Sequence, residues 1–104
     1  MHTLNVKQSE RIVRLEKSEL RAWILDKLSR RGCWEARHTS LDNVPKGAPT
    51  HMRGEIEEAA HELVKRGLIR MKPTSYGQEV SLNFARKDEV YAIIDAWKLK
   101  GGKG

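Results

Sequence analysis

Apolar residues recur at three- and four-residue spacing in three stretches of this chain, which is the pattern of a helix with one buried face. The first stretch predicts a helix over residues 18–31, with Ser18 as its N-cap and Gly32 in the left-handed position that ends many helices. Further along, Thr39 or Ser40 can cap a short helix that turns two apolar side chains inward, those of Leu41 and Val44.

The second long helix is expected to begin near Pro49 or Thr50 and to end at Arg66, because Gly67 follows. Asn83 can cap a third helix near the end of the chain. Four residues form the apolar stripe of this last helix: Val90, Ile93, Ile94 and Trp97.

Between the second and third helices the period changes to that of a half-buried strand. Residues 68–72 alternate, residues 78–83 alternate again, and turn-forming residues occupy 73–77. This pattern predicts a β-hairpin with a five-residue loop whose inward side chains are Ile69, Met71, Val80 and Leu82. Two strands alone are not stable, so the helices are expected to pack on them in an α+β fold.

The length of 104 residues is that of one domain with a modest core, which we expect to span residues 18–97. Residues 1–17 fit an N-terminal arm, a strand or an extra helical turn, and the Gly/Lys-rich residues 98–104 are expected to be a flexible basic tail. One cysteine excludes an intrachain disulfide, and no apolar run suits a membrane span or a secretory signal. These features favour a cytoplasmic protein without a membrane partner.

The chain carries 20 basic and 14 acidic side chains, a formal net charge of +6, which favours an acidic partner such as nucleic acid. The positive charge is concentrated toward both ends of the sequence. The second long helix is the exception, because residues 54–66 contain four glutamates against Lys65 and Arg66.

Three stretches of the sequence resemble parts of winged helix-turn-helix domains. EEAAHELVKRGLIRMKP is similar to their third helix and first wing strand, HTSLDNVP to their short second helix, and LIRMKPTSYGQEVSLN to their wing. The resemblance covers roughly residues 18–97, and the small chain is typical of archaeal regulators of this kind. It implies a three-helix core, a two-stranded β wing, an additional C-terminal helix, and sequence-specific binding of double-stranded DNA in transcription regulation.

In this superfamily the third helix enters the major groove and the wing contacts the backbone or the minor groove. The resemblance therefore implies that helix 49–66 reads bases and that the hairpin at 68–83 contacts the sugar-phosphate edge. His38 is a further possible phosphate contact. The nucleic-acid-binding residues expected on this basis are Arg37, Lys46, Thr50, His51, Arg53, Arg70, Lys72, Thr74, Ser75 and Tyr76.

The glutamates of the second long helix depart from the pattern of a DNA-reading helix, because carboxylates repel phosphates. Glu55 and Glu58 fit this function if they lie away from the DNA, and Glu57 can accept a hydrogen bond from cytosine. The alternative is that the acidic face of this helix binds a protein partner in a larger nucleic-acid-processing assembly. The apolar stripe of the last helix also favours a homodimer, in which two such helices meet.

The sequence shows no pattern of a catalytic, metal or cofactor site. Cys33 and His38 are spaced as one possible ligand pair, but no second pair complements them, and His51 and His61 are ten residues apart. No glycine-rich phosphate-binding loop is present, and the adjacent acid pairs point to different faces of their helices. We therefore expect a binding protein that is not an enzyme and has no cofactor.

Overall fold

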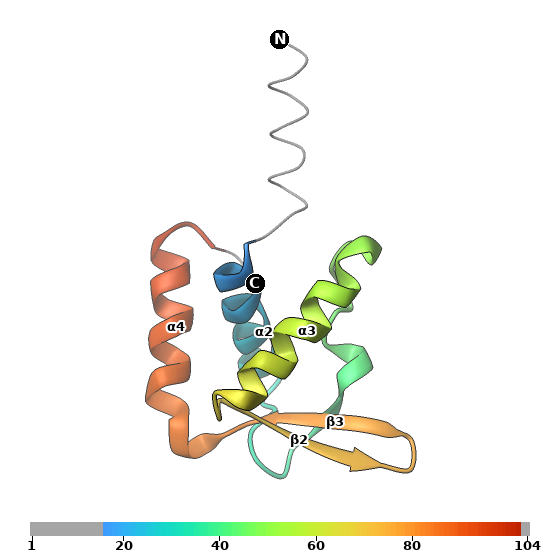
Figure 1. The fold of residues 1–104 in the computed structure, drawn as a ribbon. Coiled ribbons are helices and arrows are strands. Elements are labelled where there is room, and N and C mark those ends of the chain that lie inside the picture. Colours follow the sequence, from blue (N-terminus) through green and yellow to red (C-terminus); the bar gives the residue numbers. More distant parts are fainter. Residues whose placement is uncertain (1–15, 103–104) are drawn as a thin grey trace.

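The computed structural model describes residues 16–102, which form an α+β domain with three α-helices and a three-stranded antiparallel sheet (Figure 1). The α+β class expected from the sequence is therefore confirmed. The predicted arm at 1–17 lies almost entirely outside the described residues. In chain order the elements are α2 (Lys17–Arg30), β1 (Thr39–Ser40), the 3-10 turns η1 (Leu41–Asn43) and η2 (Thr50–Met52), α3 (Arg53–Lys65), β2 (Ile69–Thr74), β3 (Gly77–Leu82), η3 (Phe84–Arg86) and α4 (Lys87–Leu99).

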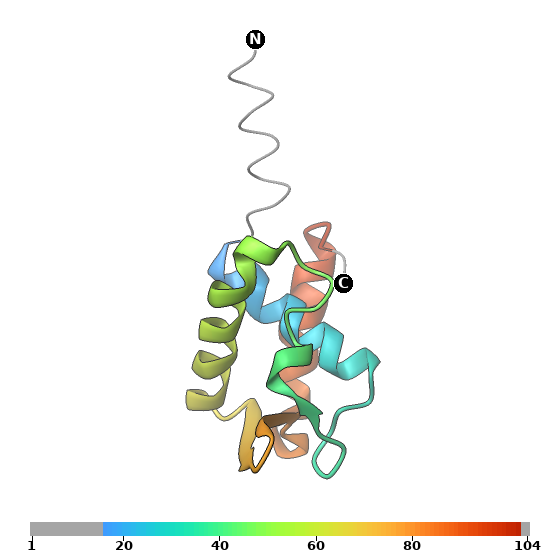
Figure 2. The same ribbon diagram turned by 90° about the vertical axis from the view of Figure 1, so that its right-hand side faces the viewer.

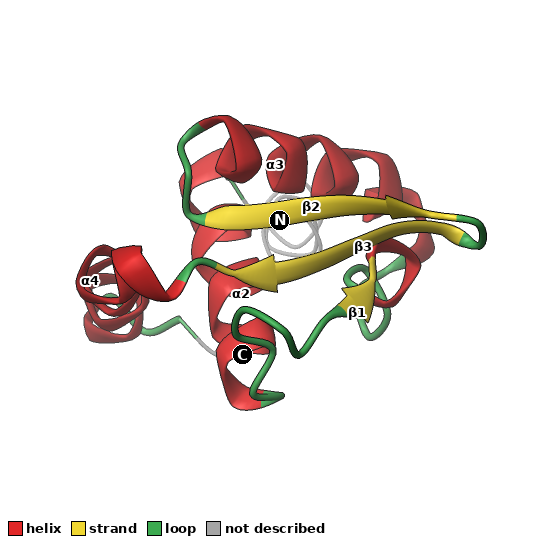
Figure 3. Cartoon of the chain, turned by 90° about the horizontal axis from the view of Figure 1, so that it is seen from below, coloured by secondary structure: helices red, strands yellow, loops and turns green. Residues whose placement is uncertain are grey.

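The sheet has the order β1-β3-β2, so the hairpin strand β3 is central and β2 is an edge strand. In the hairpin, Ile69 lies opposite Leu82 and Thr74 lies opposite Gly77. The short strand β1 pairs with β3 through Thr39 and Val80. The three helices pack on one side of this sheet, with α3 beside the hairpin and α4 at the end away from the hairpin turn (Figures 1 and 3).

The core lies between the helices and the sheet. Each of the three helices, the residue before β2 and the strand β3 contribute fully buried apolar side chains, which include Ile24, Leu25, Leu28, Ile56, Leu63, Leu68, Val80, Leu82 and Val90. The apolar face predicted for α2 is buried except for Trp23, which is half-buried against the core. Burial of these faces is the main source of stability for helices of this length.

The predicted helix boundaries are confirmed to within one residue for α2, but its predicted N-cap is wrong. Glu16 occupies the N-cap position, and its backbone N–H donates to Oε1 of Glu19 at 3.3 Å. Ser18 is therefore already inside the helix. Gly32 has φ +68°, which confirms the left-handed conformation expected after α2.

The second predicted helix is present as two pieces that follow each other directly. A 3-10 turn over Thr50–Met52 leads into α3, which ends at Lys65 and is followed by Gly67 with φ +79°. Asn83 caps the last helical segment as expected, because its side chain accepts a hydrogen bond from the N–H of Ala85 at 3.1 Å. That segment begins with the 3-10 turn η3 and continues as α4.

Two other predictions about local structure are wrong. Thr39 and Ser40 form β1, and only a single 3-10 turn follows where a short helix was expected, although Ser40 does cap it by accepting from the N–H of Asp42. The hairpin loop consists of Ser75 and Tyr76 alone, since Pro73 lies within β2 opposite Gln78. An edge strand tolerates proline because the missing N–H can face solvent.

Candidate functional site

The leading turn of α3 presents three polar side chains to solvent. Thr50, His51 and Arg53 are exposed, whereas Met52 between them is buried and anchors the turn in the core. The N–H groups of Met52 and Arg53 already donate to the carbonyl oxygens of Pro49 and Thr50, so this helix start offers an anion the positive end of the helix dipole rather than free donors. All three are among the nucleic-acid-binding residues expected from the sequence, and all three are accessible to a ligand.

A shallow hollow of about 190 Å³ lies next to this turn. Lys46, Thr50 and Arg53 line it together with Pro45, Ala48 and Pro49. The structure thus brings together three of the residues singled out from the sequence, from both sides of a proline-rich bend. Two cations and a hydroxyl border a concave surface without a carboxylate among its lining residues, which suits an anionic ligand.

Arg53 has one acidic neighbour, Glu57, on the next turn of α3. The distance from Nε of Arg53 to Oε2 of Glu57 is 3.6 Å, and both side chains are more than one third exposed. A pair of this kind contributes only about 0.3–0.5 kcal/mol. The guanidinium of Arg53 can therefore exchange this carboxylate for a stronger partner at little cost.

The other glutamates of α3 lie on the side that faces α2. Nη2 of Arg21 lies 2.9 Å from Oε1 of Glu62, and the hydrogen bond from Arg21 lowers the pKa of Glu62. Glu55 and Glu58 border a small hollow with Lys17. Three- and four-residue spacing places Glu55, Glu58 and Glu62 along one side of the helix, away from the Arg53–Glu57 pair.

The hairpin turn is formed by side chains that the sequence analysis selected as ligands. Oγ1 of Thr74 donates to the carbonyl oxygen of Gly77 at 2.8 Å and accepts from the N–H of Tyr76 at 3.2 Å. Thr74 therefore closes the turn. Ser75 and Tyr76 are exposed at its tip, where Tyr76 is 97% accessible, and Lys72 is exposed opposite Glu79.

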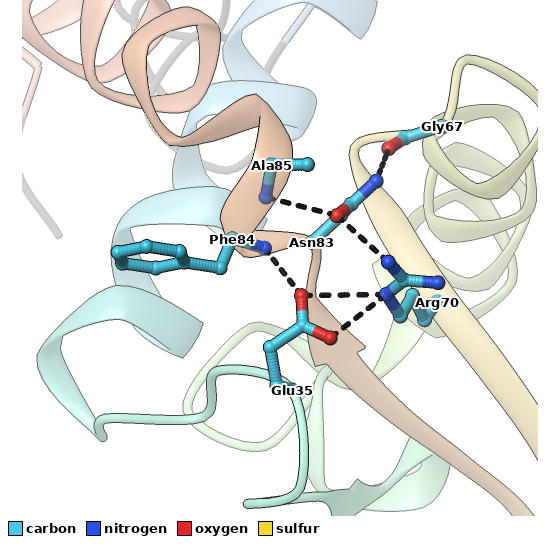
Figure 4. A network of polar contacts seen from close by, with 6 residues as sticks. All are labelled: Glu35, Gly67, Arg70, Asn83, Phe84 and Ala85. Atoms are coloured by element: carbon cyan, nitrogen blue, oxygen red, sulfur yellow. Dashed lines mark hydrogen bonds and ion pairs between the residues drawn. The ribbon is translucent and has the colours of Figure 1, made fainter.

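Arg70 is engaged within the molecule rather than free on the hairpin (Figure 4). Its Nε lies 3.1 Å from Oε1 of Glu35, and its Nη2 donates to Oδ1 of Asn83 at 3.1 Å. Glu35 also accepts from the N–H of Phe84, and this hydrogen bond is the main reason that the pKa of Glu35 is lowered. The network joins Glu35, in the segment after α2, to Arg70 near the start of β2 and to Asn83 just after β3.

Arg37 and His38 lie in the segment between α2 and β1 and are both exposed. Nδ1 of His38 lies 3.9 Å from Oε1 of Glu79. The face turned to the viewer in Figure 2 carries this segment, the 41–52 region, the start of α3 and the hairpin, with α4 behind them. Of the predicted residues, Lys46, Thr50 and Arg53 line one hollow in the part of the chain that the structure describes.

The described residues contain no group of three or more His, Cys, Asp and Glu side chains positioned to hold a metal ion. Cys33 is buried, and this burial raises the pKa of its thiol, so the reactive thiolate is disfavoured. Among residues 16–102, no helix has the length and apolar character needed to cross a bilayer. Comparison of the chain with protein-family models, with curated proteins and with solved structures finds no match.

Sequence reasoning missed two residues that shape this face. Glu35 has φ +49° and fixes Arg70, but an isolated glutamate in a connector gives no signal of that role. Lys27 is almost fully buried in α2, at a position that the helical pattern marks only as adjacent to the apolar face. Both act through contacts with residues distant in the chain.

Proposed function

We propose that this protein is a winged-helix protein that binds double-stranded DNA and regulates transcription. The leading turn of α3 enters the major groove, and the hairpin contacts the backbone or the minor groove. The observation that carries the proposal is the separation of charge on α3. Lys46 and Arg53 border the hollow at the start of the helix, whereas Glu55, Glu58 and Glu62 lie on the side toward α2.

This separation answers the main objection to a DNA-reading α3, which is its content of glutamates. A duplex that approaches the start of α3 meets Lys46, Arg53 and the positive end of the helix dipole. Glu57 is the acid nearest to this contact, and it already pairs with Arg53. Arg53 is then available to a phosphate or to guanine, and Thr50 to a phosphate or a thymine methyl.

The arrangement of elements supports the same proposal. The order of α2, α3, the hairpin and α4 is compatible with the sequence resemblance, although the 3-10 turn η1 stands where the resemblance implied a short second helix. The hairpin extends away from α4 on the side where α3 begins (Figures 1 and 3). Lys72, Ser75 and Tyr76 are exposed there and serve as backbone or groove-edge contacts.

The test is fluorescence anisotropy with a labelled duplex over a series of salt concentrations. If Lys46, Arg53 and Lys72 each neutralise one phosphate, counterion release gives a slope of log K against log salt of about −2.7, so affinity falls roughly 40-fold between about 50 and 200 mM salt. Each alanine substitution of these residues should reduce the slope by about 0.9. Lys100→Ala, beyond the end of α4, is the matched control and should leave the slope unchanged. Absence of duplex binding at low salt would refute the proposal.

A second candidate function is that α3 binds a protein partner through its acidic side. Glu55 and Glu58 are both exposed, which is the observation that favours this alternative. The double variant Glu55→Lys/Glu58→Lys separates the two functions. It should leave duplex affinity unchanged or raise it if α3 binds DNA, and it should abolish a nuclease-resistant protein complex if the acidic side is the interface.

A further inference from the structure

A second hollow lies on the other side of Lys46, where the end of α2 meets the 44–47 bend. It has a volume of about 370 Å³ and is lined by Trp23, Lys27, Arg30, Arg31, Lys46 and Gly47. Four of these six residues carry a cationic side chain, and none carries a carboxylate. No sequence pattern indicated this cluster, because its members come from two segments separated in the chain.

Lys27 builds the floor of this hollow. Its ammonium group donates to the carbonyl oxygens of Asn43, at 3.0 Å, Val44, at 2.9 Å, and Lys46. An ammonium has three protons, so all of its donors are used, and its role is to hold the bend against α2. Trp23 covers the group, with its ring centroid 5.1 Å from Nζ of Lys27. The ammonium therefore adds positive charge to the hollow without offering a free donor.

Arg30, Arg31 and Lys46 supply the accessible cationic groups. All three are exposed, and Arg30 shares its Nε with the carboxylate of Asp26 at 3.0 Å, which leaves its other nitrogens free of that bond. Burial of Lys27 and the charges of Arg31, Arg30 and Lys46 lower the pKa of Lys27. The neighbouring cations therefore disfavour the charged form of Lys27, in addition to the effect of burial.

The helix dipole explains only part of this cluster. The C-terminal end of a helix favours cations, which accounts for Arg30 and Arg31 at the end of α2. It does not account for Lys46, which lies on a different segment and whose own backbone is fixed by Lys27. A concave surface with four cations and no lining carboxylate is instead suited to bind a group with several negative oxygens.

We propose that this hollow is a phosphate-binding site, in which Arg31 and Lys46 contact the phosphate oxygens and Trp23 forms one wall. The phosphate comes either from a free polyphosphate-bearing ligand or from the backbone of a bound duplex. The site does not depend on the proposed contact of α3 with bases, because only Lys46 borders both hollows. Arg31 belongs to this hollow alone, and Arg53 belongs to the neighbouring hollow alone.

Because Arg31 lines only this hollow, its substitution tests the phosphate site separately from the proposed function. Inorganic tripolyphosphate is titrated into the wild-type protein and into Arg31→Ala, Lys46→Glu and the matched control Arg66→Ala, by isothermal titration calorimetry at low salt; Arg66 is the exposed C-cap of α3, as Arg31 is of α2, and lines neither hollow. Loss of one or two charge-assisted hydrogen bonds should weaken binding by about tenfold or more in Arg31→Ala and Lys46→Glu. Arg66→Ala should bind as the wild type does. All three side chains are exposed, so the variants should retain the thermal stability of the parent.

Duplex binding by the same variants identifies the source of the phosphate. If the DNA backbone supplies it, Arg31→Ala weakens duplex binding and tripolyphosphate competes with the duplex. If a free ligand supplies it, Arg31→Ala binds duplex normally. The proposal is overturned if tripolyphosphate does not bind at low salt, or if Arg31→Ala and Arg66→Ala bind it equally well. Loss of duplex binding in Arg53→Ala concerns the proposed function alone.

Discussion

Lys27→Met is the substitution that most directly tests how the bend before α3 is held in place. Methionine keeps an unbranched apolar stem of similar length but removes the ammonium that donates to three carbonyl oxygens. Lys27 is 8% exposed, so its ammonium group is held largely inside the fold. Among the described residues, these are the side-chain hydrogen bonds that join the bend to α2, and the variant loses all three of them.

The expected loss of stability follows from the surroundings of the three acceptors. The hydrogen bond to Val44 is buried, whereas those to Asn43 and Lys46 are part-buried and their oxygens can be rehydrated. One buried acceptor without a partner costs about 1–3 kcal/mol, and the relief of the buried charge offsets part of this loss. A net cost of about 2 kcal/mol lowers the Tm of a domain of this size by roughly 8–16 °C.

Thermal unfolding followed by circular dichroism measures this effect, with Lys17→Met as the control. Lys17 is exposed at the start of the same helix, and its substitution should change the free energy of unfolding by less than about 0.5 kcal/mol. Amide hydrogen exchange in residues 44–48 should also accelerate in Lys27→Met. Equal melting temperatures for the two variants would refute the role assigned to Lys27.

Three further predictions concern the acid response, the core and the hairpin. The pKa of Glu35 is lowered in the folded state, so its carboxylate stabilises the fold at pH values above the ordinary glutamate pKa. This contribution is lost as the pH falls through the folded-state pKa. Tm should therefore decline less steeply on acidification in Glu35→Gln than in the wild type. Leu63→Ala removes a fully buried side chain of α3 and should cost about 2–5 kcal/mol in denaturant unfolding, and a cost below about 1 kcal/mol would contradict the packing. Thr74→Val removes both hydrogen bonds that close the hairpin and should cost about 0.5–1.5 kcal/mol, with faster exchange at the N–H of Tyr76 as its local signature.

The sequence was sufficient to predict the helices and the hairpin because their signals are local. Apolar spacing marked α2, α3 and α4, and Gly32 and Gly67 marked where two of them end. The strand β1 was missed because two residues are too short to show an alternation, and it exists only through its pairing with β3. The hairpin loop was predicted too long because Pro73 was assigned to the turn, although an edge strand accepts it.

The candidate site was predictable only in part, for a related physical reason. Met52 and Ile56 mark the buried face of the helical segment that η2 and α3 form, and Thr50 and Arg53 lie off that face, so their exposure was predictable. The internal use of Arg70 by Glu35 depends on a contact between residues far apart in the sequence. The predicted homodimer and the DNA contacts themselves concern partners and stay predictions.

The most direct test of the central claim is a backbone amide NMR titration of the protein with an unlabelled duplex at low salt. The account predicts that the largest chemical-shift changes occur at residues 44–57 and at 70–77, with small changes along the outer side of α4. Changes concentrated on α4, or no changes at any duplex concentration, would contradict it.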